Sequence, residues 1–270
     1  MIKKLSAPAG DPCTLARGVR MVRRLCVAAL LLLLGAAPPG PAAAQPGVPI
    51  LVYHRFSPDN EGFTTVTDQR FEAELDWLGA HGYAVIPLED VLRWRARRRV
   101  AAITVDDGHE SVFTQLYPIL LRRHLHVTLF IYPSAISNAR YALTWDQLAV
   151  MLKSGLVDVQ SHTYWHPDFR VEAKRRQPAD YRAFVDFQLR RSRQVLQARL
   201  GIPVTMLAWP YGIYDSELEA AAGAAGYRYA FAYGGGLARP DEDPLALARI
   251  PIAGGLDLAG FAARIGPANP

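Results

Sequence analysis

The apolar residues of the 270-residue chain follow two different periods. Short runs of aliphatic and β-branched side chains predict buried strands, and stretches with an apolar residue every three or four positions predict helices. The predicted strands cover residues 50–53, 84–86, 100–105, 127–132, 157–160, 204–208, 227–233 and 248–252. The predicted helices, with their caps, cover residues 67–82, 88–94, 116–125, 144–155, 179–200 and 215–226. Because strands and helices alternate, the pattern predicts βα units that form a parallel sheet or barrel in one domain.

Capping residues mark the ends of several predicted helices. Thr67 and Asp215 stand where a side-chain oxygen can accept a hydrogen bond from the first turn. Thr144 and Gln147 have the spacing of a capping box. Gly226 follows the last apolar position of its helix, where a left-handed residue commonly ends a helix.

The first 44 residues have the order of a secretory signal peptide. Arg23 and Arg24 precede an apolar run over residues 25–34, and three alanines at 42–44 offer a small-residue cleavage site. We therefore predict a signal peptide over residues 1–44 and an exported domain, periplasmic or extracellular, over residues 45–270. Met21 by itself opens a complete leader and is an alternative start. An uncleaved N-terminal anchor is the competing interpretation, because signal peptide and anchor differ mainly in length.

Charge and cysteine content also depend on this leader. The formal net charge is +5, but six of the 30 basic side chains and only one of the 25 acidic ones lie in residues 1–44. The remainder is neutral, so we expect no nucleic-acid partner. Cys13 and Cys26 both lie in the leader. The exported chain would therefore have no disulfide, no thiolate nucleophile and no cysteine-bound zinc.

Polar motifs follow four of the predicted strands directly. His54 ends the first strand, Asp106-Asp107-Gly108 ends the third, residues 162–166 follow the fifth, and residues 209–212 follow the sixth. In parallel βα folds the carboxyl ends of the strands meet at one edge, and the site lies there. We therefore expect these motifs to converge.

The residue types in these motifs suit a metal site. His162 and His166 are four residues apart, and a helical turn would place both imidazoles on one side. Two neutral histidines and one carboxylate make the three-ligand arrangement that catalytic zinc uses. Because adjacent residues of an extended strand point in opposite directions, one of Asp106 and Asp107 could bind the metal while the other takes a proton from water. The alternatives are ordinary surface or core histidines and a structural Asp-Gly turn.

Three motifs together resemble a known family. Thr104-Val105-Asp106-Asp107-Gly108, His162-Thr163-x-x-His166 and Pro210-Tyr211-Gly212 are similar to the first three motifs of polysaccharide deacetylases, the NodB-like domain of carbohydrate esterase family 4. The similarity spans about residues 48–253. The resemblance implies a single distorted (β/α) barrel of about seven parallel strands. It also implies a divalent metal ion, commonly zinc, with cobalt, nickel or iron as alternatives.

The resemblance also implies roles for individual residues. Asp107, His162 and His166 would bind the metal, and Asp106 would be the general base. The backbone N–H of Tyr211 would stabilise the oxyanion. Thr163 would brace the loop between the two histidines.

Two positions depart from the family pattern. Ala208 stands where many members have an arginine that orients the base, and no histidine follows His166 to serve as the general acid. The opening segment, residues 49–56, resembles the subgroup that deacetylates poly-β-1,6-N-acetylglucosamine, in which the late histidine motif is relocated to the first strand. We therefore expect His54 to be the acid, with a structural histidine as the alternative. Arg249 could replace the missing arginine, with a solvent-facing arginine as the alternative.

The sequence thus predicts a monomeric, metal-dependent hydrolase that removes N-acetyl groups from an N-acetylglucosamine polymer, with no transmembrane helix in the exported chain. Two alternatives remain at this point. One is another deacetylase, either an O-deacetylase of xylan-like polymers or a peptidoglycan deacetylase. The other is a carbohydrate-binding module that has lost catalysis.

Overall fold

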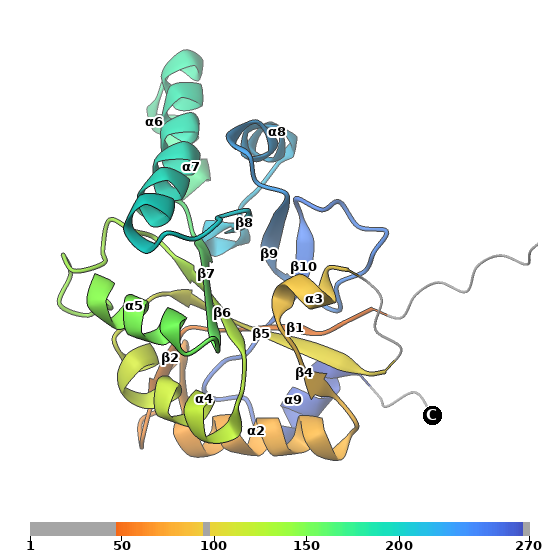
Figure 1. Ribbon diagram of the computed structural model, residues 1–270. Coiled ribbons are helices and arrows are strands. Elements are labelled where there is room, and N and C mark those ends of the chain that lie inside the picture. Colours follow the sequence, from red (N-terminus) through yellow and green to blue (C-terminus); the bar gives the residue numbers. More distant parts are fainter. Residues whose placement is uncertain (1–46, 94–97, 267–270) are drawn as a thin grey trace, which may run out of the picture. The chain divides into compact units, whose positions relative to one another are not determined.

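The computed structural model describes residues 47–93 and 98–266. Parallel strands lie at the centre of the fold and helices lie around them (Figure 1). The strands are β1 (Ile50–Tyr53), β2 (Arg55–Ser57), β3 (Thr65–Thr67), β4 (Ala84–Val85), β5 (Val100–Asp107), β6 (Val127–Ile131), β7 (Val157–Ser161), β8 (Met206–Ala208), β9 (Tyr229–Gly235) and β10 (Leu247–Pro251). The helices are α2 (Asp68–Ala80), α3 (Leu88–Val91), α4 (Tyr117–Arg123), α5 (Trp145–Lys153), α6 (Phe169–Arg175), α7 (Pro178–Leu200), α8 (Ser216–Ala225) and α9 (Leu258–Ile265). A π-helix, η1 (Val112–Leu116), and a 3-10 turn, η2 (Pro210–Gly212), complete the elements.

Strand β1 closes the sheet. It pairs in parallel with β5 on one side and with β10 on the other. The strand order β5-β1-β10-β9-β8-β7-β6 then returns to β5, which makes a seven-stranded barrel with β4 paired beside the start of β5. The predicted fold, a single (β/α) barrel of about seven parallel strands, is confirmed. Strands β2 and β3 form a separate two-stranded sheet.

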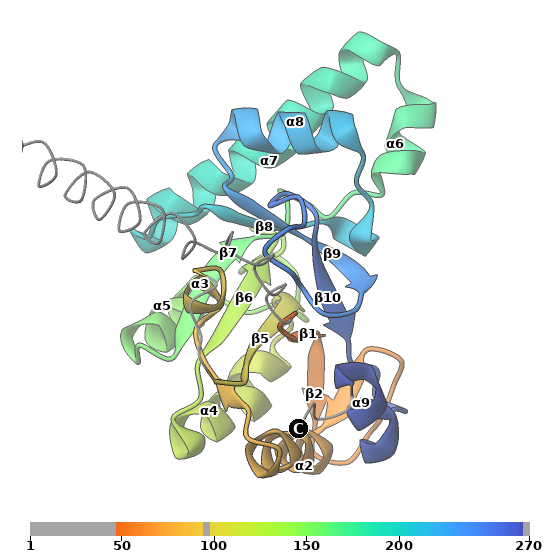
Figure 2. The ribbon, with the colours of Figure 1, turned by 90° about the vertical axis from the view of Figure 1, so that its right-hand side faces the viewer.

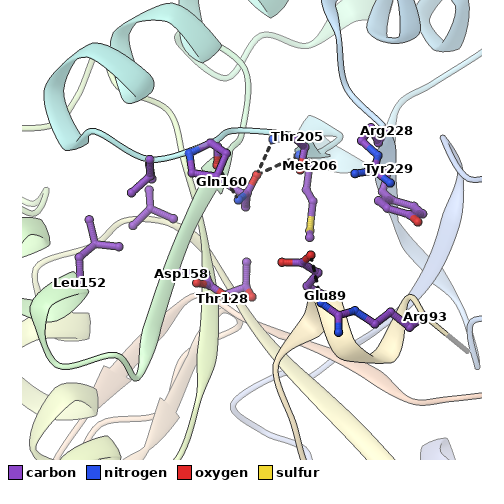
Figure 3. A pocket seen from close by; sticks show the side chains of 13 residues that line it. Glu89, Arg93, Thr128, Leu152, Asp158, Gln160, Thr205, Met206, Arg228 and Tyr229 are labelled. Atoms are coloured by element: carbon purple, nitrogen blue, oxygen red, sulfur yellow. Dashed lines mark hydrogen bonds and ion pairs between the residues drawn. The ribbon is translucent and has the colours of Figure 1, made fainter. Parts of the chain in front are cut away.

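The barrel is distorted between β7 and β8. The two strands share one register pair, Ser161 with Leu207. Figure 3 shows how Gln160 bridges the gap: its side-chain oxygen accepts hydrogen bonds from the backbone N–H groups of Thr205, at 3.0 Å, and Met206, at 2.9 Å. The side chain thereby satisfies backbone donors that a regular ladder would have paired.

The strands are buried on both faces, which explains their continuous apolar runs. One cluster of buried side chains comes from alternate strand positions such as Ile50, Ala102, Phe130 and Phe231. The strand residues between these positions belong to a second cluster, which also contains apolar side chains of the surrounding helices. Helices α2, α4, α5, α7 and α8 lie outside the strands (Figure 2).

The predicted caps are confirmed. Thr67 caps α2, Asp215 caps α8, and Thr144 forms both halves of the capping box with Gln147 at α5. Gly226 ends α8 in the left-handed conformation.

Some elements differ from the prediction. The helix expected from residue 116 begins with the π-helix η1 at Val112, and the helix expected over 88–94 ends at Val91, with residue 94 outside the described residues. Helices α6 and α9 were not predicted, because segments of seven and eight residues contain too few turns to establish a period. No helix within residues 47–93 and 98–266 is long and apolar enough to cross a membrane. The predicted signal peptide lies outside the described residues.

Candidate metal centre

Strand β5 ends in the two aspartates. Asp107 has a φ of 73°, in the left-handed region, and Gly108 follows with a φ of 76°. This left-handed φ favours glycine at position 108, and a Cβ there would also lie 2.7 Å from the Cδ1 atom of Ile131, which would have to shift. The left-handed turn changes the direction of Asp107. As a result, the carboxylates of Asp106 and Asp107 lie 3.8 and 3.6 Å from the same atom, Nε2 of His162, instead of pointing apart as extended strand geometry predicts.

The two histidines lie in the loop after β7. The segment from His162 to His166 is not helical, so the expectation that a helical turn aligns them is wrong. Thr163 and His166 both have a φ of 63°, and this left-handed geometry brings the ring centroids of the two histidines to 4.6 Å. The hydroxyl of Thr163 accepts a hydrogen bond from the backbone N–H of His166 at 3.2 Å. Thr163 therefore lies where it can brace the loop.

Asp107, His162 and His166 come together as one cluster, and their ligand atoms all lie within 4.8 Å of one another. The Oδ1 atom of Asp107 is 3.6 Å from Nε2 of each histidine. Two ligands bound about 2 Å from a zinc ion at a tetrahedral angle lie roughly 3.3 Å apart, so the cluster has nearly the spacing that such an ion requires.

The protonation states of the histidines suit metal binding. Nδ1 of His162 lies 2.7 Å from the carbonyl oxygen of Ala208, to which it donates, so the lone pair on Nε2 faces the cluster. Burial lowers the pKa of His162 to about 3 and also lowers the pKa of His166. Both imidazoles are therefore neutral at pH 7, as a metal ligand must be.

Arg249 lies beside Asp106, and both are buried. The guanidinium donates to the carboxylate through both terminal nitrogens, at 2.8 and 2.7 Å, and its Nε donates to the carbonyl of Ala232. Arg249 is 0% exposed, so the solvent-facing alternative is wrong. Burial alone would raise the pKa of Asp106, but Arg249 lowers it to about 2. Although Ala208 cannot supply a guanidinium, a different strand, β10, does.

His54 follows β1 at the same end of the barrel. Its ring contacts that of Tyr233 edge-on, with centroids 5.7 Å apart. Burial raises the pKa of Asp107, while the charge of His54 opposes that shift and helps to lower the pKa of Asp106. His54 therefore lies within electrostatic range of both carboxylates.

Tyr211 lies in the turn η2 after β8. Its φ is 55°, its side chain is 62% exposed, and its ring centroid is 4.6 Å from that of His166. Gly212 follows with a φ of 67°, and a Cβ there would lie 2.8 Å from the backbone nitrogen of Tyr233. Only glycine allows this close approach, which holds the Tyr211 backbone beside the cluster.

The sequence that makes this arrangement is similar to known proteins. A family model described as polysaccharide deacetylase matches residues 94–230, just over half of the chain. The chain belongs to the polysaccharide deacetylase family.

Relatives extend this similarity over most of the chain. It is 26% identical over 223 residues to YxkH of Bacillus subtilis, named as a polysaccharide deacetylase, with 81% of this chain and 76% of that protein covered. It is 24% identical over 197 residues to the poly-beta-1,6-N-acetyl-D-glucosamine N-deacetylase of Staphylococcus epidermidis, with 70% and 68% covered. The structure of the Streptococcus pyogenes deacetylase PplD in complex with acetate matches with a TM-score of 0.71 at 23% identity, covering 83% of this chain and 100% of that chain.

Members of this family act on polysaccharides, and the family is generally metal-dependent. Within the described residues, Asp107, His162 and His166 are the one group of three or more histidine, cysteine or acidic side chains whose geometry could hold a metal ion. A cavity of about 320 Å³ at the other end of the barrel, drawn in Figure 3, is lined by residues of β6 to β9 and of neighbouring helices and loops, and by none of these three.

The sequence did not single out two tyrosines at this end of the barrel. Tyr132 follows β6, and its ring centroid lies 5.4 Å from that of His166. Its hydroxyl is 2.9 Å from the hydroxyl of Tyr141, in the loop before α5. The strand-end rule that selected the other motifs also applies to β6 and could have found Tyr132. No local pattern marks Tyr141.

Proposed function

We propose that the protein is an exported, metal-dependent N-deacetylase of an N-acetylglucosamine polysaccharide of the poly-β-1,6-linked type. The cluster of Asp107, His162 and His166 carries this proposal, because it joins three suitable ligands next to a buried carboxylate. The relative from Staphylococcus epidermidis, whose name specifies this polymer, supports the choice of substrate. The predicted leader supports export.

Asp107, His162 and His166 would hold the metal ion, and the mixed nitrogen and oxygen donors favour zinc. When bound, such an ion supplies Lewis-acid polarisation of the amide carbonyl and a lowered pKa for water. Tyr211 is 62% exposed and its ring contacts that of His166, so a sugar would reach the cluster on this side.

Asp106 would act as the general base. Arg249 holds its carboxylate through two hydrogen bonds, so its orientation toward the cluster is fixed before substrate binds. Asp106 would accept one proton from the attacking water as the water oxygen bonds to the amide carbon.

His54 would act as the general acid. As the carbon–nitrogen bond breaks, His54 would donate a proton to the leaving nitrogen, which leaves acetate and a free amine on the sugar. The backbone N–H of Tyr211 would donate a hydrogen bond to the carbonyl oxygen as negative charge develops on it.

The test is acetate release measured together with bound metal. Wild-type protein is incubated with oligomers of β-1,6-linked N-acetylglucosamine, peptidoglycan fragments and acetylated xylan, with and without a chelator. We expect release from the β-1,6 oligomers that the chelator abolishes and zinc restores, and we expect Asp107→Ala to lose metal and activity together. Asp158→Ala, at the opposite end of the barrel, is the matched control and should retain both.

Three outcomes would contradict the proposal. Release only from xylan would indicate an O-deacetylase, and release only from peptidoglycan fragments would indicate a different polymer. Binding of oligomers with no release at saturating metal would indicate a carbohydrate-binding module.

A further inference from the structure

Two tyrosine hydroxyls lie beside the cluster and have donor and acceptor positions that their mutual hydrogen bond does not use. The hydroxyls of Tyr132 and Tyr141 are 2.9 Å apart. Each hydroxyl has one proton and two lone pairs, and one proton serves the bond between them. One hydroxyl proton and several lone pairs are left for a ligand.

The pair is close to the metal ligands. The ring of Tyr132 lies 5.4 Å from that of His166, and the charge of Asp107 acts on the Tyr132 hydroxyl. On another side, the ring of Tyr211 lies 4.6 Å from the same histidine. His166 thus contacts tyrosines from two different loops, and a ligand at the cluster would meet both.

The loop that carries Tyr141 is fixed to the loop that follows Asp107 at the end of β5. The backbone N–H of Glu110 donates to the carbonyl of Tyr141 at 2.7 Å, and the N–H of Leu143 donates to the carbonyl of Gly108 at 2.9 Å. His109 and Ala142 form an isolated bridge between these two bonds. Because the connection is made through the backbone, the hydroxyl pair has a defined position relative to Asp107.

Burial does not explain why the Tyr141 hydroxyl has a hydrogen-bond partner. Tyr141 is 44% exposed, so water could satisfy its hydroxyl without a partner. The ring of Tyr141 stacks on that of His109, with an angle of 15° between the planes, so the ring has a packing partner that does not depend on the hydroxyl. An uncharged, exposed hydroxyl pair at fixed geometry suits a ligand that is itself rich in hydroxyl groups.

We propose that Tyr141 and Tyr132 form a subsite that binds hydroxyl groups of the sugar ring whose acetyl group faces the cluster. This inference rests on the proposed function, because it assumes that a sugar substrate reaches Asp107, His162 and His166. Tyr141 is a positioning residue: it holds the ring and takes no part in proton transfer.

The experiment compares a substrate that contains sugar rings with a substrate that contains none. Wild type, Tyr141→Phe and Tyr132→Phe are assayed on a β-1,6-linked N-acetylglucosamine oligomer and on 4-nitrophenyl acetate, which has an acetyl group and no sugar. Loss of one hydroxyl contact should raise KM for the oligomer about 5- to 10-fold in Tyr141→Phe, with kcat changed less than twofold. Hydrolysis of the ester should be unchanged.

Tyr83→Phe is the matched control. Tyr83 precedes β4, which pairs with the start of β5 and therefore lies at the opposite end of the barrel from Asp107. Its kinetics on both substrates should equal those of wild type.

Two results would overturn the subsite. An unchanged KM in Tyr141→Phe would show that the hydroxyl pair only connects two loops and does not bind sugar. Equal losses on oligomer and ester would show that the pair maintains the cluster and does not bind sugar, and a fall in the unfolding temperature of Tyr141→Phe would identify that effect directly. Failure of the proposed function is separable, because wild type would then release no acetate from the oligomer. The subsite could in that case still be tested by NMR titration of wild type and Tyr141→Phe with the same oligomer.

Discussion

Removing the guanidinium of Arg249 beside Asp106 should destabilise the fold more than removing the guanidinium of an arginine in a surface ion pair. Arg249 and Asp106 are 0% and 2% exposed in their side chains and share two hydrogen bonds of 2.8 and 2.7 Å. Arg249→Met keeps the length of the side chain and leaves a buried carboxylate without a partner. Breaking a buried pair in this way costs about 3–5 kcal/mol, which is a large share of the roughly 5–15 kcal/mol that holds a typical domain folded.

A double-mutant cycle isolates this interaction. The free energy of unfolding is measured in urea at pH 7, with metal removed, for wild type, Arg249→Met, Asp106→Asn and the double variant. Each single change should be costly, and the double variant should be destabilised by roughly 3 kcal/mol less than the sum of the two. Arg123→Met is the control, because Arg123 pairs with Glu72 at the surface and should cost less than about 1 kcal/mol.

The pH dependence gives a second check. The folded pKa of Asp106, about 2, lies below its unfolded value, so its contribution to stability is present above about pH 4 and is lost as the pH falls toward 2. In Arg249→Met the largest effect that opposes burial is lost, so the carboxyl takes up a proton at higher pH. The difference in stability between the two proteins should therefore be largest near neutral pH and shrink toward pH 3. Additive single variants, with a coupling energy under about 0.5 kcal/mol, would show that Arg249 and Asp106 do not stabilise each other in the folded chain.

Three further predictions concern other parts of the molecule. Burial lowers the pKa of His162 to about 3, so the free energy of unfolding of the metal-free protein should fall as the pH drops from about 6.5 toward 3. Urea unfolding of His162→Gln should show a smaller fall over the same pH range. Gly212→Ala should cost about 1–3 kcal/mol and reduce activity, because its φ is 67° and Tyr233 is too close, whereas Gly79→Ala in α2 has open space and should be neutral or stabilising. Thr144→Ala should lower the unfolding free energy by about 1 kcal/mol through loss of the α5 capping box.

The positions of the site residues could be predicted where a rule about parallel strands applies. Asp107 and His162 follow β5 and β7, and the carboxyl ends of such strands meet at one edge. The reason given for His166 was wrong, because its approach to His162 depends on left-handed residues in an irregular loop. A helical period cannot reveal that conformation.

Long-range contacts were harder to predict. Arg249 pairs with a residue 143 positions away, and nothing near it in the chain shows whether it faces solvent or Asp106. The register of β10 in the closed barrel decides this. The partnership of Tyr132 and Tyr141 depends likewise on how one loop bonds to the next.

Asp107, His162 and His166 should together bind one divalent ion. The most direct test is zinc content and affinity, measured by mass spectrometry and calorimetry on wild type, on alanine variants of these three residues and on His126→Ala, whose ring pairs with Asp158 away from the cluster. We expect one zinc per chain in wild type and in His126→Ala, and a fall in affinity of at least a hundredfold in each of the three variants. One tightly bound zinc in Asp107→Ala, with affinity unchanged, would show that Asp107 is not a ligand and that the metal site lies elsewhere.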